Sequence, residues 1–185
     1  MSDDRAQAEI RVARLTPADA AIAAQAVADI KLHGETPAVE DDARRLRTWL
    51  ENATHILLVA LDADRPIGFA LGYLLDRVDG VDCVNDVAGA GGMNAVGVPS
   101  KMLFFYEIEV LPTYRRRGVG GALVERMKHI ARTERVAKMW VQTDPENHAA
   151  RGLYERMGGQ ASAAADLIYT WTASRLQEAT EDASV

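Results

Sequence analysis

The sequence feature that most restricts the fold is a turn of arginines and glycines that joins a strand to a helix. The apolar segment MLFFYEIEVL (102–111) predicts the strand, and apolar side chains at helical spacing predict a helix over residues 118–135. The linker reads LPTYRRR, and the helix opens on GVGG. A short apolar segment, MWVQTD (139–144), predicts a further strand, so this part of the chain is expected to form a β-α-β unit.

The rest of the chain extends this unit to one α/β domain with a mixed sheet. Apolar runs, capping residues and turn residues predict the other strands at 9–15, 55–62, 67–76 and 166–172 and the other helices at 16–32, 39–51 and 147–157. The expected domain spans 9–172, between flexible ends at 1–8 and 173–185. Residues 77–101 hold five of the fourteen glycines and predict an inserted loop or flap.

The composition restricts the kinds of partner. The chain has 185 residues, 48% of them hydrophobic, and its net charge of −6 argues against a nucleic-acid partner. The single cysteine, Cys83, cannot form a disulfide within the chain, and the four histidines show no ligand spacing, so no metal is expected. No secretory leader and no apolar run of about 18 residues stands out, which favours a cytoplasmic location without a membrane partner.

The arginine–glycine turn has the chemistry of an anion site. The first N–H groups of a helix lack intrahelical partners and carry the positive end of the helix dipole. Glycines leave this backbone open to a bulky anion, and arginines add donors for phosphate oxygens. The residues concerned are Arg115, Arg116, Arg117, Gly118, Gly120 and Gly121. The pattern fits a pyrophosphate but neither a Walker A loop nor the dinucleotide fingerprint, and the alternative is a solvated basic turn that ends in glycine.

A second signal lies on the predicted helix 147–157. Asn147 and Tyr154 are seven residues apart, about two helical turns, and therefore lie near one face of the helix. Tyr154 could donate a proton to a leaving group. The alternative is an amphipathic side chain that packs on the sheet.

The two motifs together, RRRGVGG after a strand and then NHAARGLYERMG, resemble the acetyl-CoA-dependent N-acetyltransferases of the GNAT superfamily. The expected order of elements matches that fold across most of the chain. The resemblance implies one GNAT-like domain, with a mixed, mostly antiparallel sheet that splays at its centre and is flanked by about four helices. It also implies acetyl-CoA as co-substrate, with the pyrophosphate on the helix 118–135 and the pantetheine arm in the splay between strands 102–111 and 139–144.

The resemblance also implies which residues bind and react. Those expected to bind acetyl-CoA are Val110, Arg115, Arg116, Arg117, Gly118, Val119, Gly120, Gly121, Asn147 and Tyr154. For direct attack by an amine in a ternary complex, Glu107 is the favoured general base and Glu109 the second choice. A main-chain N–H near Val110 would stabilise the oxyanion, and Tyr154 would protonate the thiolate. Both glutamates share a face if the strand is regular, and a bulge would separate them.

Short strings around these motifs look most like the aminoglycoside 3-N-acetyltransferases. This resemblance implies a primary amine of an aminoglycoside as acceptor, and a role in antibiotic resistance. Asp144 and Glu107 are then the candidate acceptor-binding residues, because acidic side chains attract a polycation. The alternatives are a polyamine, a protein or peptide amine, or an acyl-CoA-binding module without turnover. A homodimer is also left open.

Overall fold

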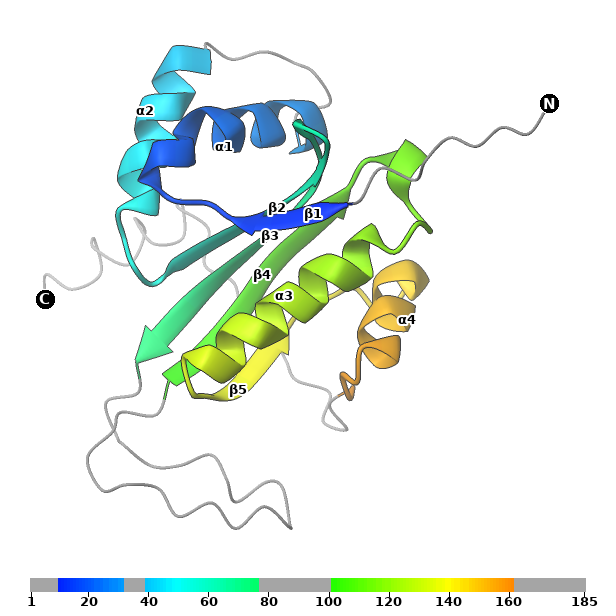
Figure 1. The fold of residues 1–185 in the computed structure, drawn as a ribbon. Coiled ribbons are helices and arrows are strands. Elements are labelled where there is room, and N and C mark those ends of the chain that lie inside the picture. The colour runs from blue at the N-terminus through cyan, green and yellow to red at the C-terminus, as the bar shows by residue number, and fades with distance from the viewer. Residues whose placement is uncertain (1–9, 32–38, 77–100, 162–185) are drawn as a thin grey trace, which may run out of the picture.

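Five strands form one mixed sheet in the computed structural model, which describes residues 10–31, 39–76 and 101–161. They are β1 (Arg11–Arg14), β2 (His55–Asp62), β3 (Arg65–Asp76), β4 (Lys101–Val110) and β5 (Val136–Val141). The strands lie side by side in chain order (Figure 1). β1 to β4 are antiparallel, and β5 runs parallel to β4, so the predicted mixed, mostly antiparallel sheet is confirmed.

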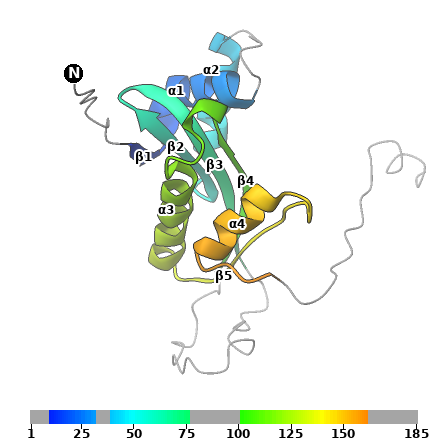
Figure 2. The same ribbon diagram turned by 90° about the vertical axis from the view of Figure 1, so that its right-hand side faces the viewer.

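Four α-helices flank the sheet within the described ranges. They are α1 (Ala20–Ala26), α2 (Val39–Leu50), α3 (Val119–Thr133) and α4 (His148–Arg156). α1 and α2 cover one face of the sheet, α3 crosses the other face, and α4 lies beside α3 (Figures 1 and 2). No helix in these ranges is long and apolar enough to cross a membrane.

Alternate side chains of β2 enter two different cores. Ile56, Leu58 and Ala60 pack under α3, whereas the side chains between them face α1 and α2. Because successive side chains of a strand point to opposite faces, a strand covered on both faces needs apolar residues at every position. The double burial therefore explains the unbroken apolar sequence of this strand.

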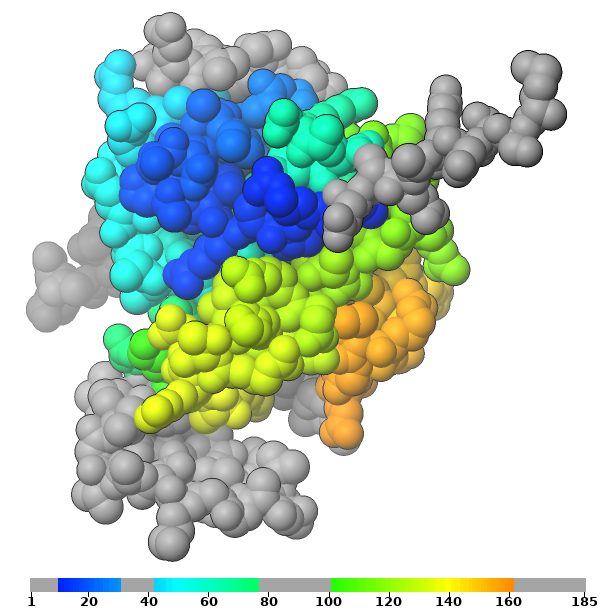
Figure 3. Space-filling model, in the orientation of Figure 1, coloured from blue at the N-terminus to red at the C-terminus, as the bar shows by residue number. Residues whose placement is uncertain are grey.

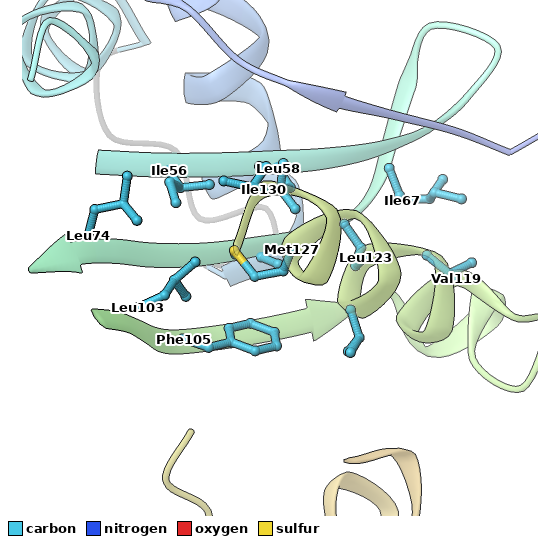
Figure 4. Packing of buried hydrophobic residues seen from close by; sticks show 13 residues of the cluster. Ile56, Leu58, Ile67, Leu74, Leu103, Phe105, Val119, Leu123, Met127 and Ile130 are labelled. Atoms are coloured by element: carbon cyan, nitrogen blue, oxygen red, sulfur yellow. The ribbon is translucent and has the colours of Figure 1, made fainter. Parts of the chain in front are cut away.

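One apolar stripe attaches α3 to the sheet. The buried side chains of the stripe are Val119, Leu123, Met127 and Ile130, and they point toward the strands (Figure 4). Burying each such side chain contributes about 1.5–3 kcal/mol relative to leaving it in water. This packing fixes the position of the first turn of α3 relative to the end of β4.

The predicted order of elements is confirmed within the described ranges, but several strand boundaries differ, among them those of β1, which is Arg11–Arg14 rather than 9–15. β5 begins at Val136 rather than 139, because Val136 already pairs with Lys101 of β4, and it ends at Val141, before Asp144. β3 begins at Arg65 rather than 67, because the hairpin turn uses only Ala63 and Asp64. Ala63 makes this tight turn in the left-handed region, at φ 52°.

The predicted helices also differ at their ends. α3 starts at Val119, with Gly118 as its N-cap, and the strand before it occupies 101–110 rather than 102–111. The first predicted helix, 16–32, is divided into a 3₁₀ turn (Pro17–Asp19), α1 and a π-helical turn (Val27–Lys31). An alanine-rich stretch has too few large side chains for its periodicity to mark these changes.

Several predictions fall on residues that the structure does not describe. They are the strand 166–172, the insert 77–101 apart from Lys101, and the flexible ends 1–8 and 173–185.

The packing of α3 generates a stability prediction. Leu123→Ala removes a side chain that is 0% exposed and should lower the free energy of unfolding by about 2–5 kcal/mol, because it leaves a cavity between α3 and the sheet. Urea denaturation followed by circular dichroism measures this change. The matched control is Leu75→Ala, at a residue that is 40% exposed, which should change stability by less than about 1 kcal/mol. Equal losses in both variants would contradict the assignment of this core.

Candidate functional site

A compact basic turn leads from β4 to α3. A 3₁₀ turn (Pro112–Tyr114) follows β4, and Arg115, Arg116 and Arg117 are all exposed beyond it. Gly118, the N-cap of α3, lies at φ 86° and provides no side chain to cap the helix. The first N–H groups of α3 therefore have no side-chain cap and directly follow three exposed arginines, which is the sequence of groups expected of an anion site.

The three glycines of this turn have different surroundings. A methyl group at Gly118 would meet nothing within 4 Å, so this position is open as the sequence analysis expected. A methyl group at Gly120 would lie 3.2 Å from Leu153 Cδ2, and one at Gly121 would lie 3.7 Å from Met157 Sδ. Gly120 therefore has a packing role that sequence reasoning missed, because it allows α4 to lie directly against α3.

α3 and α4 together form one surface beside the turn (Figures 2 and 3). Besides the contact at Gly120, Lys128 Nζ of α3 donates to the Met157 carbonyl oxygen at the end of α4, over 3.1 Å. The two helices are thus held together at the C-terminal half of α4.

β4 and β5 part about halfway along β4. Their pairing ends at Phe105 and Val141, while β4 continues to Val110. Leu111 N–H donates to the Ile67 carbonyl on the β3 side, over 2.9 Å. Because backbone groups alternate along a strand, those of Val110 point to the side that β5 has left. Consistently, the Val110 carbonyl accepts a hydrogen bond from Arg115 Nε, over 3.0 Å, which ties the basic turn to this edge.

A bulge in β4 decides where the two glutamates point. Leu71 of β3 pairs with Glu107, but the next residue, Gly72, pairs with Phe105, so Tyr106 is an extra residue in β4. The bulge precedes both Glu107 and Glu109 and does not separate them.

The glutamates lie on the face of the sheet that α1 and α2 cover. Glu107 and Glu109 pair with Leu71 and Phe69, which belong to the core on that face, and directly paired residues share a face. Both glutamates are half-buried. On the far side of the bulge, Phe105 is buried under α3.

Aromatic rings run along the same face beside the glutamates. Neighbouring centroids lie 4.3 to 5.9 Å apart in the series Trp49, His55, Tyr73, Tyr106, Phe104 and Trp140. Tyr106, at the bulge, is 52% exposed. A partly exposed π-face next to a carboxylate is a suitable environment for an ammonium group.

Tyr154 lies on the opposite face from the glutamates. Its ring packs edge-on against Phe105, with the centroids 6.2 Å apart, in the core under α3. Burial raises the pKa of the Tyr154 phenol above its ordinary value, so the hydroxyl keeps its proton at neutral pH. The packing interpretation therefore leaves a protonated hydroxyl in place, although burial makes it a weaker acid than an exposed tyrosine.

Asn147 and Asp144 shape the loop between β5 and α4. Asn147 Oδ1 accepts from Ala150 N–H, over 3.0 Å, and caps α4. Asp144 Oδ1 accepts from Glu146 N–H, over 2.8 Å, and its carbonyl accepts from Asn147 N–H. Asp144 is exposed and lies beyond the strand end at which it was expected.

The basic turn also has an anchor that the sequence analysis did not identify. Tyr114 donates its hydroxyl hydrogen to Asp62 Oδ2, over 2.8 Å, and this bond raises the pKa of the Tyr114 phenol. The Arg117 guanidinium carbon lies 5.4 Å from the centroid of the Tyr114 ring. Two residues 52 positions apart share no sequence period, so only the fold could bring them together.

The sequence matches the model of the acetyltransferase (GNAT) family over residues 24–159. The chain therefore belongs to the GNAT acetyltransferase family and is an acetyltransferase of that class. A comparison with curated proteins found no match.

Solved acetyltransferases share this fold. The aminoglycoside acetyltransferase meta-AAC0020 from an uncultured soil metagenomic sample, in complex with sisomicin, has a TM-score of 0.64 at 15% identity, over 88% of this chain and 97% of that chain. Aminoglycoside N-acetyltransferase AAC(6')-Iy in complex with CoA has a TM-score of 0.64 at 18% identity, over 89% and 95%. The ribosomal-protein-alanine N-acetyltransferase from Brucella melitensis biovar Abortus 2308 has a TM-score of 0.60 at 18% identity, over 89% and 100%.

The glycine geometry generates a prediction with a matched pair of variants. Gly118→Ala places a side chain in the left-handed region and should destabilise the protein by about 1–2 kcal/mol. Gly121→Ala, within the helix and in ordinary contact with Met157, should stabilise it by up to about 1 kcal/mol. Thermal or urea unfolding measures both values. A stabilising Gly118→Ala would rule out the left-handed N-cap.

Proposed function

We propose that this chain transfers an acetyl group from acetyl-CoA to a primary amine in a ternary complex. The proposal rests on the position of the N-terminus of α3, which no side chain caps. This turn, with its exposed arginines, lies beside the edge of β4 that β5 has left. An anion site next to an open strand edge fits a carrier with a diphosphate at one point and an amide-containing arm beyond it.

The residues present fit such a carrier. The N–H groups of Gly118, Val119, Gly120 and Gly121 would hold the diphosphate, together with Arg115, Arg116 and Arg117. The backbone of Val110 would bind the amide groups of the arm, and Asn147 and Tyr154 would contact it from α4. AAC(6')-Iy, which shares the fold, was solved in complex with CoA, and this supports the assignment.

The proposed chemistry uses groups on both faces of β4. As the amine nitrogen bonds to the thioester carbonyl carbon, the Glu107 carboxylate takes the proton of the amine, with Glu109 as the alternative base. The Val110 N–H stabilises the negative charge that develops on the carbonyl oxygen. As the carbon–sulfur bond breaks, Tyr154 gives its proton to the departing thiolate. The phenol then regains a proton from the solvent, which takes up the proton that Glu107 accepted.

For the acceptor we propose a cationic small-molecule amine, with an aminoglycoside as the first candidate and the 3-N position as its reactive amine. The half-buried Glu107 beside the exposed ring of Tyr106 supports an ammonium substrate, and the exposed Asp144 adds negative charge. Structures of similar fold include aminoglycoside acetyltransferases, one of them of the 6' type. A polyamine, a peptide amine or an acyl-CoA-binding module without turnover is the alternative.

Calorimetry with CoA and a thiol-release assay with acetyl-CoA test the function. The wild-type protein should bind CoA and release thiol with at least one amine from a panel of aminoglycosides, polyamines and peptides. Arg116→Ala/Arg117→Ala should raise the Kd for CoA about 10- to 100-fold, because charge-assisted hydrogen bonds are lost. Arg132→Ala, which removes an exposed arginine at the other end of α3, is the control and should leave the Kd unchanged. A wild-type protein that does not bind CoA would refute the proposal.

The general base is tested by a pair of conservative variants. Glu107→Gln should lower kcat about 10²- to 10⁴-fold with little change in the KM for acetyl-CoA, because the amine loses its proton acceptor. Glu109→Gln, on the same face of the same strand, should lower kcat less than about tenfold. Steady-state kinetics across a pH series measures both variants, and a larger loss in Glu109→Gln would exchange the two roles.

A further inference from the structure

The arginine–glycine turn is fastened to the β2–β3 hairpin by a single tyrosine. Tyr114 ends the 3₁₀ turn, where its N–H donates to the Leu111 carbonyl over 2.8 Å. Its hydroxyl reaches Asp62, the last residue of β2, over 2.8 Å. The phenol therefore links the basic turn to the end of the hairpin at which β2 stops.

The same ring supports one of the arginines of the turn. The Arg117 guanidinium lies over the Tyr114 ring at 5.4 Å from its centroid, within the range of a cation–π interaction. Arg115 is held separately, by Val110. Hence two of the three guanidinium groups have fixed partners, and the partner of Arg117 is itself fixed by Asp62.

Fixing an arginine before an anion arrives reduces the conformational entropy lost on binding. An exposed arginine that no neighbouring side chain holds would lose its rotamer freedom when its guanidinium binds a phosphate. Tyr114 is only half-buried and lies at the edge of the core, so its hydroxyl is not needed to fill space. The Asp62 bond orients the ring but adds no apolar burial.

We infer that Tyr114 is a positioning residue for the diphosphate site: Asp62 fixes its hydroxyl, and its ring holds Arg117 in place for the anion. This inference rests on the proposed use of CoA. Neither side chain is assigned a direct contact with the reacting atoms, so the expected effect is on cofactor affinity rather than on the chemical step.

A graded series of variants tests the inference. Tyr114→Phe keeps the ring and removes the hydroxyl, and should raise the Kd for CoA about fivefold, the factor for one ordinary hydrogen bond. Tyr114→Leu also removes the ring and should raise it about 10- to 25-fold. In both variants the KM for acetyl-CoA should rise while kcat and the KM for the amine stay the same.

The role of Asp62 is tested in the same way. Asp62→Ala should match Tyr114→Phe, and Asp62→Asn, which keeps an acceptor oxygen, should have a smaller effect. The double variant Tyr114→Phe/Asp62→Ala should be no worse than Asp62→Ala alone, because both changes remove one interaction. The control is Thr133→Val, which removes a hydroxyl hydrogen bond at the far end of α3 and should leave the Kd unchanged.

Hydrogen exchange of the free protein gives a readout independent of catalysis. Backbone amides of residues 113–121 should exchange faster in Tyr114→Phe than in the wild type, because the turn opens more often. If the wild type binds CoA and Tyr114→Phe binds it equally well, the inference is wrong and the proposed function stands. If the wild type does not bind CoA, both the proposed function and this inference are wrong. Additive effects of Tyr114→Phe and Asp62→Ala would also overturn it.

Discussion

The attachment of α3 to the sheet is the interaction on which the rest of the structure depends. A stripe of buried side chains, from Val119 to Ile130, holds the helix across the strands. This packing places the first turn of the helix at the end of β4. The basic turn therefore gains its electrostatic character from backbone geometry, and its arginines add to a field that the helix already provides.

Candidate functional side chains lie on both faces of the sheet around β4. After the bulge at Tyr106, the carboxylates of Glu107 and Glu109 face the side of α1 and α2, while Tyr154 packs against Phe105 on the side of α3. The strand between them has lost its partner β5. In the mechanism that we propose, the proton acceptor for the amine nitrogen and the proton donor for the sulfur thus lie on opposite sides of one strand.

The sequence predicted the features that depend on periodicity and missed those that depend on register or long-range contact. The apolar run of β2 and the stripe of α3 were readable because both repeat at a regular spacing. The bulge could not be predicted, because Glu107 and Glu109 alternate in the same way with or without an extra residue before them. The start of β5 at Val136 was missed because the partner strand decides it, and the bond from Tyr114 to Asp62 joins segments with no common pattern.

The contact between Gly120 and Leu153 decides how closely α3 and α4 can pack. Because a methyl group at Gly120 would lie only 3.2 Å from Leu153 Cδ2, a larger residue there requires the Leu153 side chain or α4 to shift. Tyr154 follows Leu153 directly and would be carried along. In the site that we propose, the distance from the basic turn to the Tyr154 phenol therefore depends on how closely α3 and α4 pack at Gly120.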